Sequence, residues 1–290
     1  MTTHNFECLL FEFSEGIATL TLNRPDRMNA FGMSQSQDLI SALDVTDADD
    51  SIKAVIITGA GKAFSSGADL SGGGFARERA EETGPIDKLP VARDGAGVIT
   101  LRLYASRKPL IAAVNGPSVG MGATIQLGMD IRLASTEAHY HFVFGRRGIV
   151  PEGCSTYFLP RLVGIGTAME WCASGRRVPA GEALERGLVR SLHSPEDLMP
   201  AARAIAKDMA DNVAPVSMAL TRQMMWRMMG ASHPMEAHIA ESRALHHRFR
   251  SADAREGVGA WLQRREPNFP DKVSELPDIW PGWQEPAYEA

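Results

Sequence analysis

The sequence predicts an α/β protein in which strands and helices alternate through most of the chain. Short runs of aliphatic and β-branched residues recur between residues 8 and 134, which is typical of buried strands. Glycine-rich turns and helix-like stretches separate these runs, and such alternation favours an α/β core. From residue 194 onward the pattern changes to consecutive helical runs. We therefore expect an α/β core followed by a helical C-terminal part.

The N-terminal part of the chain supplies the predicted strands in order. The runs CLLFEF and GIATLTL lie on either side of a turn at residues 14–16, which predicts a β-hairpin. Ser34 and Gln37 form a capping box and predict a helix that ends near residue 44. Segment 72–96 is glycine-rich and charged without a period, so we expect a mobile flap or a partly disordered loop. Further strands are predicted at residues 54–58, 110–114 and 131–134, and a helix at residues 154–162.

The C-terminal part is predicted to be helical. Ser194 is a candidate N-cap, with Pro195 at the first helical position. Residues 266–290 contain five prolines, so we expect an extended arm or a disordered tail. The helical runs cover residues 216–229, 235–249 and 252–263. We divide the chain into a core (1–193), a helical region (194–265) and an extended proline-rich tail (266–290).

Composition excludes several classes of protein. The 290 residues suit one large or two small domains, and 30 Lys+Arg against 35 Asp+Glu give a net charge of −5. This balance lacks the basic field of a nucleic-acid-binding protein. No basic segment followed by a long apolar run opens the sequence, and no later run reaches membrane-spanning length, so no membrane partner is expected. Cys8, Cys154 and Cys172 have neither zinc-site nor disulfide spacing, which predicts a reduced, cytoplasmic protein.

Two glycine-rich turns carry the functional signal. KAFSSGADL (62–70) and NGPSVGMG (115–122) each follow an apolar strand and lead into a helix start. Glycine lets such a turn point backbone N–H groups at an approaching negative charge. Two turns of this kind are able to aim two amides at one oxygen, the geometry that an enolate needs.

Two other patterns predict different chemistry. Gly116 to Gly120 matches the G-x-S-x-G element of serine hydrolases, with Asp130 and either His139 or His193 following in the expected order. Pro117 fixes φ directly before Ser118 and disfavours that strained turn, so we expect no nucleophilic serine. His139 and His141 alternate along a strand-like run without a third ligand, so we expect no metal site.

Five motifs together resemble the enoyl-CoA hydratase/isomerase, or crotonase, family. The resemblance covers residues 5–261 and implies a spiral of β-β-α turns that acts on coenzyme A thioesters. It also implies that region 194–265 forms the interface of a homotrimer, and that two trimers often assemble into a hexamer. No metal or redox cofactor is implied, and coenzyme A is part of the substrate. The motifs are RPDRMNA (24–30), KAFSSGADL (62–70), NGPSVGMG (115–122), MDIRLAS (129–135) and GIVPEGCSTYFLPRLVG (148–164).

The same resemblance implies roles for individual residues. The oxyanion hole falls on the backbone N–H groups of Ala68 and Met121. The two glutamates of hydratases are replaced by Thr124 and Phe144, and neither side chain takes a proton near neutral pH. Arg24, Arg27 and Lys62 are candidates for contacts with the coenzyme A phosphates. The predicted coenzyme A site comprises Arg27, Met28, Ala30, Lys62, Ser66, Gly67, Asp69 and Leu70.

Glu152 is the remaining candidate for acid–base catalysis. Its PEG element resembles that of peroxisomal-type Δ3,Δ2-enoyl-CoA isomerases, in which this glutamate is catalytic. A following helix lowers its pKa, whereas burial beside residues such as Phe142 and Phe144 raises it. We therefore interpret the chain as an enoyl-CoA isomerase. The alternatives are an enoyl-CoA hydratase, another enolate reaction of the same fold, or an acyl-CoA-binding member without catalysis.

Overall fold

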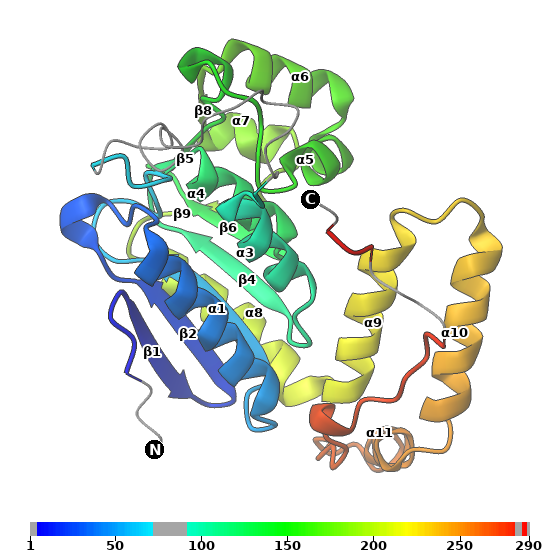
Figure 1. Cartoon of the computed structure of the whole chain (residues 1–290). Coiled ribbons are helices and arrows are strands. Elements are labelled where there is room, and N and C mark those ends of the chain that lie inside the picture. Colours follow the sequence, from blue (N-terminus) through cyan, green and yellow to red (C-terminus); the bar gives the residue numbers. More distant parts are fainter. Residues whose placement is uncertain (1–4, 72–91, 282–285, 289–290) are drawn as a thin grey trace.

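The computed structural model describes residues 5–71, 92–281 and 286–288, and a six-stranded sheet lies at its centre (Figure 1). The strand order is β1-β2-β3-β4-β6-β9. β1 and β2 form the predicted antiparallel hairpin, and every later neighbour pairs in parallel. Parallel pairing requires crossover connections, which the intervening segments supply. The strands are β1 (Leu9–Ser14), β2 (Ile17–Leu22), β3 (Ala54–Gly59), β4 (Leu110–Val114), β6 (Ile131–Ser135) and β9 (Ser191–His193), so the predicted α/β class is confirmed.

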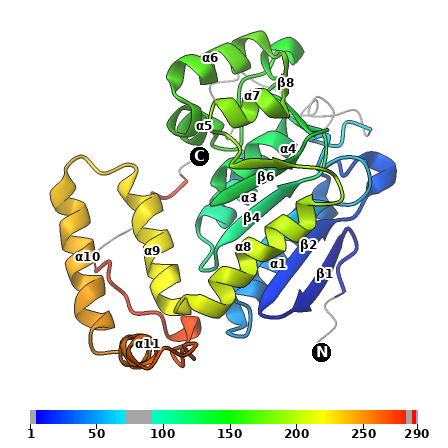
Figure 2. The same ribbon diagram turned by 180° about the vertical axis from the view of Figure 1, so that it is seen from behind.

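Helices cover both faces of this sheet, as the two opposite views show (Figures 1 and 2). Val55 of β3 belongs to the apolar cluster that includes α1 (Met33–Ala48) and α3 (Gly95–Tyr104). The next residue, Ile56, belongs to the cluster that includes α8 (Leu198–Asn212). Successive side chains of a strand point to opposite faces, and β3 is buried on both.

A second sheet of three short strands, in the order β5-β7-β8, lies next to the large one (Figure 1). Short helices surround it, and this part of the molecule carries the motifs at residues 115–122 and 148–164. The strands are β5 (Ser118–Val119), β7 (His139–His141) and β8 (Arg177–Pro179). The helices are α4 (Met121–Thr124), α5 (Ser155–Val163), α6 (Ile165–Ser174) and α7 (Ala180–Glu185).

The helices after residue 194 divide into two groups. α8 packs on the sheet through Ala202, Ala206 and Ala210. The next three helices extend away from the sheet (Figures 1 and 2). These are α9 (Pro215–Met228), α10 (Pro234–Arg248) and α11 (Ala252–Gln263), close to the predicted bounds. A helical region that starts at residue 194 thus includes one helix that packs on the core sheet.

One arginine ties α9 to the core. The buried Arg222 donates to the carboxylate of Asp130 at 2.9 Å. It also donates to the carbonyl oxygens of Leu103 at 2.8 Å and Tyr104 at 2.7 Å, at the end of α3. The last carbonyls of a helix lack partners within the helix, so Arg222 supplies donors to this end of α3, where Leu103 O also accepts from Ser106 N at 3.2 Å.

Several helix bounds differ from the prediction. α1 begins at Met33, directly after Gly32, and continues to Ala48. No side chain caps its start, so the predicted capping box at Ser34 and Gln37 is wrong. α8 begins at Leu198 because residues 194–197 form a turn, in which Ser194 O accepts from Leu198 N at 3.1 Å.

The predicted flap needs correction where the structure describes it. α3 begins at Gly95 with Asp94 as its N-cap, so the end of segment 72–96 is helical, and residues 72–91 lie outside the described residues. The part of the tail that the structure describes is extended, which is one of the two predicted alternatives, and residues 273–279 pack back on the molecule. Val273 and Ile279 are buried, and Ser274 donates to Asp50. Among the described residues, no helix is long and apolar enough to cross a membrane.

Candidate active site

The first glycine turn lies between two other segments of the core. Phe31 pairs with Ala68 as an isolated parallel bridge, with Phe31 N donating to Gly67 O at 2.7 Å. On the other side, Ser65 pairs with Ser118 in the same way. The turn 62–70 is therefore held between the RPDRMNA segment and the second glycine turn.

The two predicted oxyanion-hole amides come from adjacent segments. Gly67 has φ +95°, and a side chain there would lie 2.5 Å from Val119 O and 3.6 Å from the backbone nitrogen of Met121. Met121 is the first residue of α4, so its N–H has no acceptor within the helix. Among the hydrogen bonds of the described residues, neither this amide nor that of Ala68 donates to a backbone acceptor. Both N–H groups are available to an external oxygen.

Glu152 lies in the turn that precedes α5. Gly153 follows it at φ +65° and Cys154 at φ +55°, conformations that glycine adopts easily and other residues rarely. This turn brings the carboxylate to α4, where the Thr124 hydroxyl donates to Glu152 Oε1 at 2.8 Å. Thr124, which stands where hydratases are expected to carry their first glutamate, is thus a hydrogen-bond partner of Glu152.

Burial decides the charge state of this carboxylate. It raises the pKa of Glu152 from its ordinary value of 4.5 to about 7, the hydrogen bond from Thr124 opposes the rise, and the negative charge of Asp94 adds to it. Desolvation, which was predicted to raise this pKa, is thus the largest influence on it. Phe142 and Phe144 are buried in the core, where Phe142 stacks on Trp171 with ring centroids 6.0 Å apart.

The predicted coenzyme A residues lie on two adjoining segments. Ser66 N donates to Met28 O at 2.9 Å, and Ser66 Oγ donates to Arg27 O at 3.3 Å. The exposed members are Arg27, Met28, Lys62 and Leu70, whereas Ala30 and Gly67 are buried. Exposed side chains of both segments are thus brought to one part of the surface.

Asp69 and Arg24 stabilise this region from within. Hydrogen bonds from Ser71, together with one from Arg24, lower the pKa of Asp69 to about 2. Arg24 Nη2 lies 2.9 Å from Asp69 Oδ2, and its Nη1 donates to Ala30 O at 2.8 Å. Arg24, expected to meet phosphates, is therefore engaged within the fold. Its role as a brace was missed, since the partner carboxylate lies 45 residues away.

The serine-hydrolase pattern does not form a catalytic triad. Ser118 is fully buried, and its Oγ accepts from Gln126 Nε2 at 2.9 Å. Asp130 is paired with Arg222 and Trp226. His139 and His141 lie on β7 as expected, with ring centroids 6.0 Å apart. No group of three or more possible metal ligands occurs in the part of the chain that the structure describes.

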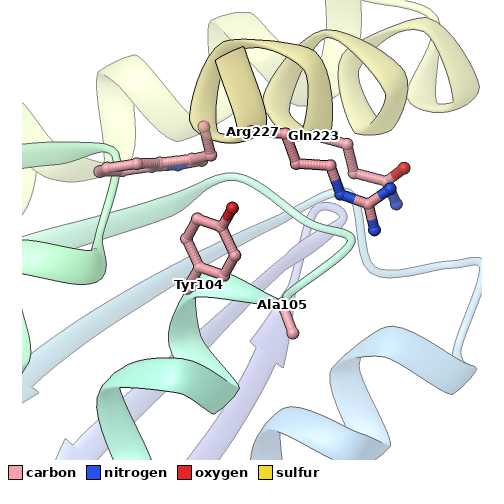
Figure 3. A pocket seen from close by; sticks show the side chains of 5 residues that line it. Tyr104, Ala105, Gln223 and Arg227 are labelled. Carbon is pink, nitrogen blue, oxygen red and sulfur yellow. The ribbon is translucent and has the colours of Figure 1, made fainter. Parts of the chain in front are cut away.

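A small cavity of about 40 Å³ lies between the end of α3 and α9 (Figure 3). Tyr104 and Ala105 line it from one side, and Gln223 and Arg227 of α9 line it from the other. Glu152 lies near the opposite end of α3. There, Asp94 Oδ1 accepts from the N–H of Gly153, the residue that follows Glu152. This cavity is therefore separate from the candidate active site.

Comparison with known proteins agrees with this geometry. A family model described as enoyl-CoA hydratase/isomerase matches residues 12–272. "Enoyl-CoA hydratase ACTT3" of Alternaria alternata is 38% identical over 90% of this chain and 86% of its own length. The "1,2-epoxyphenylacetyl-CoA isomerase" of Escherichia coli (strain K12) is 32% identical over 92% of this chain and 99% of its own.

Solved structures give the same result for the fold. A probable enoyl-CoA hydratase/isomerase from Mycobacterium abscessus has a TM-score of 0.81 at 33% identity, covering 91% of this chain and 99% of its own. A monofunctional enoyl CoA isomerase from M. smegmatis has a TM-score of 0.66 at 30% identity, covering 80% and 97%. The predicted crotonase-type fold is confirmed.

Proposed function

Since the chain belongs to the enoyl-CoA hydratase/isomerase family, we propose that it is an enoyl-CoA isomerase that moves a double bond from C3 to C2 of an acyl-CoA. The observation that carries the proposal is the environment of Glu152. Its carboxylate is partly buried and has a pKa of about 7. Thr124 and Phe144 occupy the positions at which hydratases are expected to carry glutamates.

In this proposal the thioester oxygen accepts hydrogen bonds from the N–H groups of Ala68 and Met121. Glu152 takes a proton from C2, and the electron pair moves onto the thioester oxygen as an enolate that these amides stabilise. Glu152 then returns the proton to C4, which leaves the double bond between C2 and C3. A base with a pKa near the working pH serves both steps, because it must accept the proton and release it again.

The proposal needs no resident cofactor, since coenzyme A is part of the substrate. The exposed Arg27 and Lys62 are suited to the phosphates of coenzyme A, and the exposed Met28 and Leu70 to its apolar parts. We also place the protein in the cytoplasm, because its cysteines are free and have no disulfide partner among the described residues.

A homotrimer or hexamer belongs to the same proposal. α11 and the end of α10 expose large apolar side chains. Among them are Phe249, directly after α10, at 74%, and Trp261 and Leu262 of α11 at 77% and 68%. Such surfaces are typical of subunit interfaces. Analytical ultracentrifugation of the full chain measures this directly, and a monomer at micromolar concentration would contradict the assembly.

Hydration is the second candidate, because relatives at 38% identity are named enoyl-CoA hydratases. Hydration needs one group to activate water and another to protonate carbon. Asp94 is the second carboxylate beside Glu152, but its Oδ1 accepts from the N–H groups of Gly97 and Gly153. A carboxylate that caps a helix is poorly placed to protonate a substrate, which favours isomerisation.

A panel of two substrates distinguishes these functions. The protein is mixed with a 3-enoyl-CoA, and isomerisation appears as rising absorbance of the conjugated thioester. With a 2-enoyl-CoA, hydration appears as falling absorbance. Turnover of the first substrate alone supports the proposal, whereas turnover of the second alone favours the hydratase. Calorimetric binding of both without turnover would indicate an acyl-CoA-binding protein and end the enzymatic assignment.

A further inference from the structure

Thr124 connects the two functional parts of the candidate active site. It is the last residue of α4, three positions after Met121, and its side chain is fully buried. Its Oγ1 lies 3.3 Å from the carbonyl oxygen of Met121 and 2.8 Å from Glu152 Oε1. One hydroxyl group therefore lies between the short helix that offers the oxyanion-hole amide and the turn that offers the carboxylate.

The turn around Glu152 is shaped to admit this hydroxyl. A side chain at Gly153 would place its Cβ 2.7 Å from Thr124 Oγ1, closer than real Cβ atoms approach. On its other side, the N–H of Gly153 donates to Asp94 Oδ1 at 3.1 Å, and Asp94 also caps α3. The carboxylate is thus bonded to α4, while the backbone of its turn is bonded to the start of α3.

We propose that Thr124 is a positioning residue that fixes the Glu152 carboxylate relative to the oxyanion-hole amide of Met121. This inference rests on the proposed function. A threonine hydroxyl has one proton, and an ionised carboxylate offers only acceptors, so Thr124 donates to Oε1 while Glu152 is ready to act as a base. The other oxygen, Oε2, then faces no competition from this hydroxyl and is the atom that takes the proton from C2.

The same contact has a consequence for the charge of Glu152. A hydrogen bond to the ionised form favours that form, so Thr124 counteracts burial. Asp94, at the start of α3, is the charged neighbour, and it acts in the opposite direction. The nearby Cys154 thiol has a pKa raised by burial and by Asp94 and Glu152, which Arg93 opposes, so it is neutral in the same range. Removing Thr124 or the charge of Asp94 must therefore shift the titration of Glu152 in opposite directions.

The test compares Thr124→Val, which keeps the shape and removes the hydroxyl, with Thr124→Ser, which keeps the hydroxyl. We expect Thr124→Val to lower kcat for a 3-enoyl-CoA by about 10- to 100-fold, in the range of a lost charged hydrogen bond. Binding of a saturated acyl-CoA, measured by calorimetry, should change little, and Thr124→Ser should restore most of kcat. Equal kcat in Thr124→Val and the parent would overturn the inference.

A second measurement follows Glu152 itself. Carboxyl-resolved NMR titration of ¹³C-glutamate-labelled protein should show the pKa of Glu152 rising by about one unit in Thr124→Val and falling in Asp94→Asn. A Glu152 pKa that stays unchanged in Thr124→Val would overturn the inference, even if kcat falls. If Thr124→Val does not fold, Thr124→Ala takes its place in both measurements.

The inference and the proposed function fail in different ways. Glu152→Gln with parental isomerase activity removes the function itself. Activity lost in Glu152→Gln but kept in Thr124→Val leaves the function standing and removes the role of Thr124.

Discussion

The turn that carries Glu152 and the turn that carries Asp69 place two carboxylates in opposite environments. Asp69 accepts from Ser71 and Arg24, and its pKa falls to about 2. Glu152 has one hydroxyl donor and is desolvated, and its pKa rises to about 7. The number of donors and the loss of water decide this difference, since both residues lie in loops. Asp69 is suited to bracing its turn and Glu152 to moving a proton.

The largest expected effect is that of Glu152→Gln on catalysis. The amide keeps the size of the side chain but removes the base, so kcat for a 3-enoyl-CoA should fall by about 10²–10⁴-fold. Glu137→Gln, at an exposed position, is the matched control and should change little. Steady-state rates at saturating substrate measure both variants. If the Glu152→Gln enzyme kept the parental rate, Glu152 would have a structural role, like Asp69, and would not be the base.

The same substitution should affect stability in a pH-dependent way. The folded-state pKa of about 7 lies above the ordinary value of 4.5, so the fold favours the protonated carboxyl. That contribution is fully present below pH 4.5 and is lost as the pH rises through 7. Glu152→Gln should therefore gain up to about 3 kcal/mol in unfolding free energy, relative to the parent, between pH 4 and pH 8. Urea unfolding at both pH values measures the gain, and a constant difference would contradict the raised pKa.

The proposed oxyanion hole gives the next effect. Met121→Pro removes a backbone donor, and kcat should fall by on the order of 10²-fold or more, whereas Met121→Leu keeps the donor and should retain most activity. Circular dichroism and substrate binding check that the proline variant is folded. Full activity in a folded Met121→Pro protein would rule out this amide as a donor.

The smallest effect is expected at Asp69. Asp69→Asn weakens the pair with Arg24, and an ion pair near the surface stabilises a protein by less than about 1 kcal/mol. We expect a modest rise in KM through loosening of turn 62–70 and little change in kcat. The pH dependence of kcat, measured from pH 5 to 9, should keep its midpoint. A shifted midpoint would show that the two carboxylates are coupled.

The sequence predicted those parts of the molecule that depend on local patterns. The strand at residues 110–114 and the helix at residues 252–263 have the predicted bounds. α3 was missed because its sequence GAGVITLRLY begins with glycine and continues with β-branched residues, both poor helix formers, and tertiary packing overrides that preference. The capping box at Ser34 failed because the helix had already begun at Met33.

The sequence pointed to candidate residues for the site but not to the contacts between them. The glycine turns and Glu152 carry recognisable motifs, whereas the hydrogen bond from Thr124 joins positions 28 residues apart and has no sequence signal. The sequence left open whether the helix or burial controls the pKa of Glu152. That balance depends on how much water reaches the carboxylate, which the folded arrangement of α3, α4 and the turn before α5 determines.

The position of Arg222 in the chain has a consequence for biosynthesis. The acceptors that it satisfies, at the end of α3, are translated more than 110 residues before it. While the ribosome makes the intervening chain, these carbonyls cannot accept from Arg222, and water hydrates them instead. The sheet can form before α9 leaves the exit tunnel, but the end of α3 reaches its final packing only afterwards. Completion of the N-terminal half of this protein therefore waits for the synthesis of its C-terminal part.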